Sequence, residues 1–246
     1  MQFELLPVID PMLSIYQMPR DFDRFKAYLK LLHGDTKNDL DLPIGYFNPM
    51  AKPHVLDKLK KLRVIGAEEI ISKTLHQLNP AISQIPFSTF KVVMALADDA
   101  QGGWTNRYTT DFDSKFKTSA LVRRLFCNPL FWVSDEINEK YIEQTTLQYC
   151  YRCIYQLLHQ KPITLADYIA QEIYVARHAG VSISVPTENE LAVLSHFYRL
   201  HRDTDNYPVI FSFLYGDEAA VQLGYSPLGI NIPIAGFRYA ASQGML

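Results

Sequence analysis

Apolar side chains recur at intervals of three and four residues along most of the chain, which predicts amphipathic helices. The first clear helix is expected over residues 21–33, with Asp21 as its cap and Gly34 as its stop signal. A second helical region spans about 54–78, and Gly66 is expected to divide it. Proline and glycine therefore separate helices rather than strands in this part of the chain.

The second half of the chain carries the strongest helical signals. The longest helix is expected over about 134–159, where apolar residues keep a helical period. Two further helices are expected to open with capping boxes, Thr164 with Asp167 and Thr187 with Glu190. After a short helix near the C-terminus, we expect an irregular tail.

Three segments are less regular. Residues 87–97 are almost entirely apolar and are expected to form a core helix, whereas 104–112 alternates aromatic, polar and threonine residues and is the best candidate for a strand or extended loop. Residues 207–215 fit either a buried strand or a helix. The whole pattern predicts a mostly α protein, a single helical domain over 1–246 with seven or more helices and at most a few short strands.

Charge and composition narrow the class of protein. The 246 residues include 24 Lys and Arg against 26 Asp and Glu, and this balance argues against a nucleic-acid partner, which needs a basic face. The longest uncharged stretch, 219–237, is interrupted by proline and glycine, so we expect no membrane partner. No secretory signal is recognised, and three cysteines fit a reducing compartment, so the expected location is the cytoplasm.

The loop ADDAQGGWTNRYTTDFD, residues 97–113, holds the most unusual chemistry. Arg107 is the only cation between Asp99 and Lys115, and its planar guanidinium among amides and hydroxyls suits a carboxylate or phosphate ligand. The alternative is that Arg107 pairs with an aspartate of its own loop and pins that loop. The candidate ligand-binding residues are Asp98, Asp99, Trp104, Asn106, Arg107, Tyr108 and Asp111.

Acidic residues give a second set of candidates. Glu136, Glu139 and Glu143 would share one face at the start of the long helix, where they either face water or line a polar cavity as acid, base or cation ligand. Glu172 falls on the apolar face of its helix and must have a partner, an Arg or Lys in a structural pair or a shared proton or metal in a functional site. The candidate catalytic residues are Glu136, Glu139 and Glu172.

Other chemistry is not indicated. No pair of histidines has the spacing of a metal site on a helix, so no metal ligand is predicted, and the sequence names no cofactor. Cys150 and Cys153 lie deep inside the expected long helix and are interpreted as core thiols rather than a redox pair.

These patterns favour a protein with one polar pocket for a small anionic or polar molecule, the small-molecule ligand being the partner expected. If the protein is an enzyme, which the sequence leaves undecided, acid–base or metal-assisted hydrolysis is the best reaction class. The alternative is an interaction protein without a catalytic site, whose 15 tyrosines and 14 phenylalanines would serve core and interface. The oligomeric state is not predicted.

Overall fold

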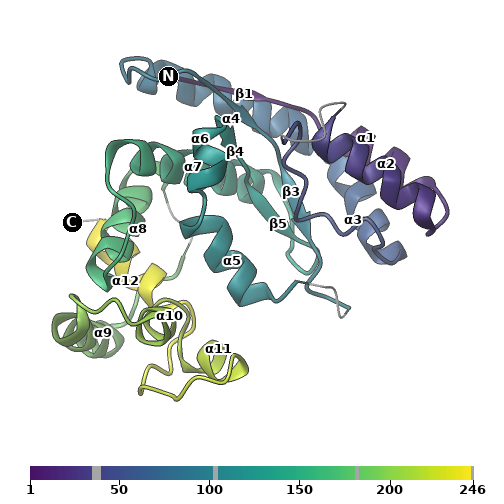
Figure 1. Ribbon diagram of the computed structural model, residues 1–246. Coiled ribbons are helices and arrows are strands. Elements are labelled where there is room, and N and C mark those ends of the chain that lie inside the picture. Colours follow the sequence, from purple (N-terminus) through teal and green to yellow (C-terminus); the bar gives the residue numbers. More distant parts are fainter. Residues whose placement is uncertain (35–39, 102–104, 181–182, 245–246) are drawn as a thin grey trace. The chain divides into compact units, whose positions relative to one another are not determined.

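The computed structural model describes residues 1–34, 40–101, 105–180 and 183–244 (Figure 1). Helices account for most of this described part and the strands are short, so the mostly α prediction with seven or more helices is confirmed. The chain divides into two compact units, Met1–Cys150 and Tyr151–Leu246. The expectation of a single domain stays a prediction.

The first unit opens with helices whose ends follow the sequence signals. The Asp21 side chain accepts the N–H groups of Asp23 and Arg24, and Gly34 ends the same helix. Gly66 adopts left-handed geometry between the next two helices, as expected for the residue that divides them. The helices are α1 (Ile9–Gln17), α2 (Phe22–His33), α3 (Pro53–Val64), α4 (Ala67–Ile82), α5 (Arg107–Phe116), α6 (Ser119–Arg123) and α7 (Glu139–Leu158), the last continuing into the second unit.

Five short parallel strands lie among these helices in the described part of the chain. β1 (Gln2–Leu5), β2 (Thr89–Val92) and β4 (Phe126–Cys127) form a sheet in that order. β3 (Ala95–Ala97) pairs with β5 (Leu130–Trp132) in parallel. The expected helix over 87–97 is therefore wrong, because this segment supplies β2 and β3. Strands of a parallel sheet that are covered on both faces are almost continuously apolar, so they lack the alternation that identifies an exposed strand.

The two sheets are continuous, because backbone hydrogen bonds join the segment between β2 and β3 to the segment between β4 and β5. Between β2 and β3, Val93 N–H donates to Cys127 O at 2.9 Å and Ala95 N–H to Pro129 O at 2.8 Å. The Asn128 side-chain amide donates to Val93 O in the same interruption. Consequently β3 and β5 continue in the direction of β2 and β4, and both end at the same edge.

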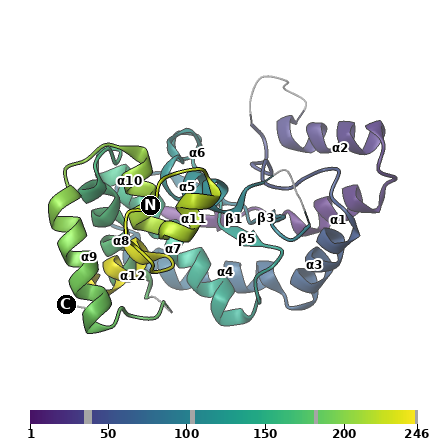
Figure 2. The ribbon, with the colours of Figure 1, turned by 90° about the horizontal axis from the view of Figure 1, so that it is seen from below.

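Helices pack against these strands and against one another. α4 lies along β1, and Asn79 of α4 exchanges hydrogen bonds with the backbone of Phe3, 2.8 Å from the Phe3 nitrogen (Figure 1). Figure 2 shows α1, α2 and α3 gathered together at one end of this unit. The helices thereby cover the apolar strands. Polar residues follow the carboxyl ends of these strands.

The segment expected to be extended, 104–112, is mostly helical where it is described. Asn106 accepts the N–H of Thr109 at 3.1 Å and caps α5, which begins at Arg107. Phe112 and Phe116 then lie four residues apart on one buried face. The extended prediction is wrong because the alternation of residue types concealed this cap, and Trp104 lies outside the described residues.

The expected long helix begins later than predicted. α7 starts at Glu139, and the side chain that accepts the N–H of Tyr141 at 2.9 Å is that of Asn138 rather than Ser134. Cys150 and Cys153 are buried on this helix and form no disulfide, which agrees with their interpretation as core residues.

In the second unit both predicted capping boxes are present, Thr164 with Asp167 and Thr187 with Glu190. The ambiguous segment 207–215 is a helix. The helices of this unit after α7 are α8 (Leu165–Ala179), α9 (Glu188–His201), α10 (Tyr207–Tyr215), α11 (Asp217–Gln222) and α12 (Ala235–Gly244).

The C-terminal helix α12 corrects the expectation of an irregular tail. α12 packs against α8, α9 and α10 (Figure 1). Its glycines allow close approach, because a Cβ on Gly236 would lie 2.9 Å from Leu214 Cα and one on Gly244 would lie 2.9 Å from Ala176 Cβ. Glycine and alanine are weak markers of a buried face, so this helix is not predicted from the sequence.

One buried carboxylate organises the irregular segment before α12. Asp217 accepts the backbone N–H groups of Leu228, Gly229 and Ile230 at 2.9, 2.7 and 2.8 Å. Three charge-assisted hydrogen bonds hold this loop beside the start of α11. Within the described residues, no helix is long and apolar enough to cross a membrane.

Candidate functional site

The carboxyl ends of β3 and β5 bring a polar cluster together in the first unit. Asp98 and Asp99 follow β3 directly, and Ser134 and Asp135 follow β5 after one further residue. Because the strands are parallel, these residues leave the sheet at the same edge. Ligands of open parallel sheets bind at this edge, so the cluster is the candidate functional site.

Arg107 connects the two strand ends. Its Nη1 donates to the carboxylate of Asp99 and to Ser134 Oγ at 2.8 Å, and its Nη2 donates to Asp135 Oδ1 at 2.9 Å. The guanidinium carbon also lies 5.0 Å from the ring centre of Trp132. As the first residue of α5, Arg107 is placed by the Asn106 cap that precedes it.

The cation and its carboxylates differ in exposure. The Arg107 side chain is 41% exposed, whereas those of Asp99 and Asp135 are 6% and 12% exposed. Arg107 thus does pair with an aspartate of its own loop, but it also bridges to the other strand end. Asp111 makes a different pair, with Lys115 at 2.5 Å along α5.

Hydrogen bonds keep this cluster ionised in spite of burial. Burial disfavours the charge on Arg107, but the hydrogen bonds to Asp135 and Asp99 outweigh it and raise the pKa of Arg107. Burial also disfavours the charge on Asp99, but the hydrogen bonds from Ser134 and Arg107 outweigh it and lower the pKa of Asp99. Both groups are therefore charged at neutral pH.

A histidine–aspartate pair belongs to the same cluster as Arg107. His54 Nε2 is 2.9 Å from Asp98 Oδ2, and the Asp98 side chain is 6% exposed. Asp98 also accepts the N–H of Ala100 at 3.1 Å, and Thr105 Oγ1 donates to its backbone carbonyl. The other ring nitrogen of His54, Nδ1, is enclosed and has no hydrogen-bond partner among the described residues.

Two more side chains complete the cluster. Lys58 lies four residues after His54 on α3 and donates to the backbone carbonyl of Asp135. Burial lowers the pKa of Lys58, and the nearby Asp135 opposes that shift. Tyr141 of α7 donates to the Asp135 carboxylate, and burial raises its pKa. The site therefore draws on α3, α5, α7 and both strand ends.

The predicted ligand-binding residues have different positions around this cluster. Asp98, Asp99 and Arg107 contribute side chains to it. Asn106 is exposed and caps α5, Tyr108 is half-buried on α5, and Asp111 pairs with Lys115. The position of Trp104 is not among the described residues.

The predicted acidic face is corrected by the late start of α7. Glu136 precedes the helix and is exposed, so it does not share a helical face with Glu139 and Glu143. Glu139 is exposed and lies 3.7 Å from the ammonium of Lys73. Glu136 interacts electrostatically with Lys58 and is thus the predicted acid linked to the cluster.

Glu172 belongs to the second unit and has the partner that its position demanded. Its two oxygens accept from Arg152 Nε at 2.9 Å and Nη2 at 2.5 Å, and both side chains are 4% exposed. Gln171 Nε2 donates to the same carboxylate at 3.2 Å. The expectation of a buried, partnered Glu172 is confirmed, and a catalytic role for it stays a prediction.

Sequence reasoning missed five members of the cluster. A signal was present in the two short apolar runs that end in polar residues, VVMALA before Asp98 and LFWV before Ser134. Such runs are typical of buried parallel strands, whose carboxyl ends carry functional residues. The missed residues are His54, Lys58, Ser134, Asp135 and Tyr141.

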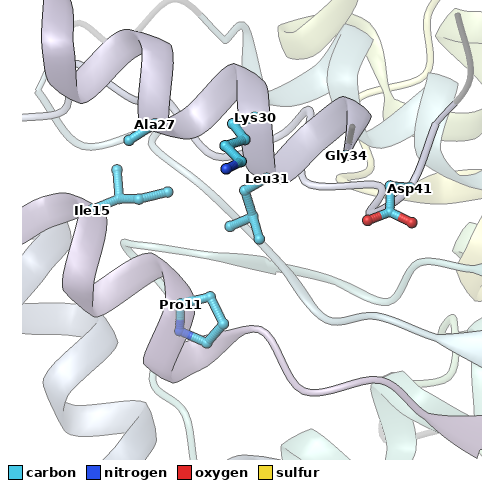
Figure 3. Close-up of a pocket in the computed structure, with 7 residues that line it drawn as sticks. All are labelled: Pro11, Ile15, Ala27, Lys30, Leu31, Gly34 and Asp41. Carbon is cyan, nitrogen blue, oxygen red and sulfur yellow. The ribbon is translucent and has the colours of Figure 1, made fainter. Parts of the chain in front are cut away.

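A pocket lies elsewhere in the first unit, between α1 and α2, with a volume of about 630 Å³ (Figure 3). None of the residues predicted from the sequence as functional lines it. Within the described ranges, no group of three or more His, Cys, Asp or Glu side chains is arranged to hold a metal ion. The pocket is lined by Pro11, Ile15, Ala27, Lys30, Leu31, Gly34 and Asp41.

No family model, curated protein or solved structure matches this chain. The chemistry of the cluster is therefore the basis for a functional proposal. Its cations retain exposure while its carboxylates are buried, and this combination suits recognition of an anionic group. The His54–Asp98 pair adds an imidazole that is held in place by a buried carboxylate.

Proposed function

We propose that the first unit binds a small anionic molecule at the carboxyl edge of its parallel strands. The observation that carries this proposal is the position of Arg107, which is anchored by both strand ends and still 41% exposed. A guanidinium fixed in this way loses little conformational entropy when it binds a carboxylate or phosphate.

The neighbouring groups have complementary roles in the proposal. Lys58 has one N–H directed at the carbonyl of Asp135 and two others for a ligand oxygen. His54, held by Asp98, would act as general acid or base if the ligand is turned over. The reaction class would then be acid–base hydrolysis of a small anionic substrate.

A titration of the intact protein tests the binding proposal. A panel of small carboxylates and phosphate esters is screened by thermal shift, and hits are measured by calorimetry. Arg107→Lys keeps the charge but loses the fork, so we expect at least tenfold weaker binding with an unchanged fold. The matched control is Arg63→Lys, an exposed arginine 3.2 Å from Asp10 on the same unit, which should bind like wild type.

A second outcome would contradict the proposal. If Arg107→Ala lowers the melting temperature and no anion in the panel stabilises wild type, Arg107 only fastens the strand ends together. An interaction protein would then be the better reading. That alternative is supported by exposed apolar side chains in the first unit, Val64 at 89% and Phe22 at 67% exposure.

A further inference from the structure

Arg24 is a buried cation in the first unit that the proposed site does not use. It lies on α2 and is only 3% exposed. Its guanidinium carbon is 4.8 Å from the ring centre of Tyr16 on α1, a cation–π contact. An arginine as buried as this is normally paired with a carboxylate, because an isolated charge loses its hydration.

No carboxylate of the described residues pairs with its side chain. Within the described residues, no acidic group forms an ion pair with Arg24, and its Nε is enclosed without any hydrogen-bond partner. Neither Nη1 nor Nη2 donates to another described side chain or carbonyl, whereas the similarly buried Arg152 has Glu172. The contrast shows that Arg24 lacks the compensation that the other buried arginine receives.

The charged side chain that acts on the Arg24 guanidinium is another cation, because the nearby Asp21 carboxylate accepts the backbone N–H of Arg24 at 3.2 Å instead. Arg20 is close enough to repel it electrostatically, and burial together with that repulsion lowers the pKa of Arg24. Arg20 itself donates to the backbone carbonyl of Met50 at 2.9 Å. The hydroxyls of Tyr16 and Tyr28 donate to the carbonyls of Asn48 and Ile44, each at 3.1 Å, so neither neutralises the charge.

We propose that Arg24 is a second anion-binding site, which takes a carboxylate or phosphate group with Arg20 as a supporting cation. A bound oxyanion would accept hydrogen bonds from the guanidinium donors and would compensate the buried charge. The ring of Tyr16 holds the guanidinium in place from one side. This inference does not depend on Arg107, because the two arginines lie on different helices and Arg107 is already paired with Asp99 and Asp135.

The test measures thermal unfolding of the full chain with inorganic phosphate or with acetate, in chloride buffer of constant ionic strength. Wild type should melt about 2–6 °C higher at ten times the dissociation constant of the preferred anion. A larger shift with phosphate than with acetate would indicate a phosphate ligand, and the reverse would indicate a carboxylate ligand.

Arg24→Met should abolish the part of this shift that depends on Arg24. In chloride alone it should melt no lower than wild type, because methionine replaces an uncompensated buried charge by an apolar side chain of similar length. Arg24→Lys, which retains a charge but not the fork, should keep only part of the shift. Arg107→Lys should retain the part that depends on Arg24, and Arg63→Met is the matched surface control with the full shift.

Four results would overturn the inference. The first is that neither anion stabilises wild type. The second is a full shift in Arg24→Met or Arg24→Lys. The third is a large loss of melting temperature in Arg24→Met without any anion, which would make Arg24 a structural cation held by Tyr16. If Arg24→Met does not fold, the size of the shift in Arg24→Lys decides. The fourth is loss of the shift in Arg107→Lys alone, which would assign the binding to the Arg107 site.

Discussion

Arg152 and Glu172 share two hydrogen bonds in an environment where both side chains are 4% exposed. Their mutual attraction is offset by the cost of removing two charges from water, so the intact pair adds little net stability. Removal of one partner has a much larger effect, because the other charge remains buried and uncompensated.

Glu172→Gln should therefore lower the free energy of unfolding by about 3–5 kcal/mol, measured by urea denaturation. The matched control is Asp23→Asn, which breaks the exposed Lys26–Asp23 pair and should change stability by less than about 1 kcal/mol. A Glu172→Gln protein as stable as the control would mean that the Arg152 charge is compensated in another way.

Asp99 gives a prediction for pH. Its pKa is below the ordinary value of 3.8, since the hydrogen bonds from Ser134 and Arg107 outweigh burial. The unfolded chain therefore binds more protons in acid, and the stability from Asp99 is complete above about pH 5 and lost as pH falls through its folded-state pKa. The difference in free energy of unfolding between wild type and Asp99→Asn should therefore shrink as the pH falls through this range. A difference that stays constant from pH 7 to pH 2 would contradict this.

At the residue scale, part of the candidate site could be predicted from the sequence. Asp98, Asp99 and Arg107 stand out because they are charged residues in one short glycine-containing loop. His54 and Asp135 could not be identified in the same way. They reach the site through α3 and β5, and their proximity depends on long-range strand pairing that no local pattern contains.

Helix ends were the most predictable elements. The residues that cap a helix satisfy its free N–H groups locally, so their signal is contained within four residues. Thr164→Ala and Thr187→Ala should each lower the free energy of unfolding by about 0.5–2 kcal/mol in urea titrations. Ser14→Ala, which removes an exposed hydroxyl inside α1, should lie within about 0.5 kcal/mol of wild type. Equal losses of stability at all three positions would show that the two capping threonines do not stabilise their helices more than an ordinary exposed hydroxyl does.

Strands and tightly packed helices were the least predictable elements. Residues 87–97 read as a helix because burial on both faces removes the alternation of a strand. α12 was missed because the small faces of Gly236 and Gly244 create contacts by allowing close approach rather than by being apolar. In both cases tertiary packing, and not local preference, determines the element.

At the scale of the whole molecule, α7 runs without a break through the boundary between Cys150 and Tyr151. Both tryptophans, Trp104 and Trp132, fall within residues 1–150, so their fluorescence reports the first unit. If the chain is a single cooperative domain, as the sequence predicts, Glu172→Gln in the second unit should shift the fluorescence and circular dichroism transitions equally. A fluorescence transition that stays at the wild-type midpoint would show two independent domains.

The parallel pairing of β1 with β2 also has a consequence for biosynthesis. Phe3 of β1 lies opposite Phe90, and its N–H donates to Asn79, 76 residues further along the chain. At about 5–20 residues per second, a ribosome makes β1 roughly 4–17 s before it makes β2. During that interval the backbone groups of β1 are unpaired and the Phe3 ring is not packed against Phe90. Chaperones that bind short apolar segments can therefore bind β1 before the sheet forms.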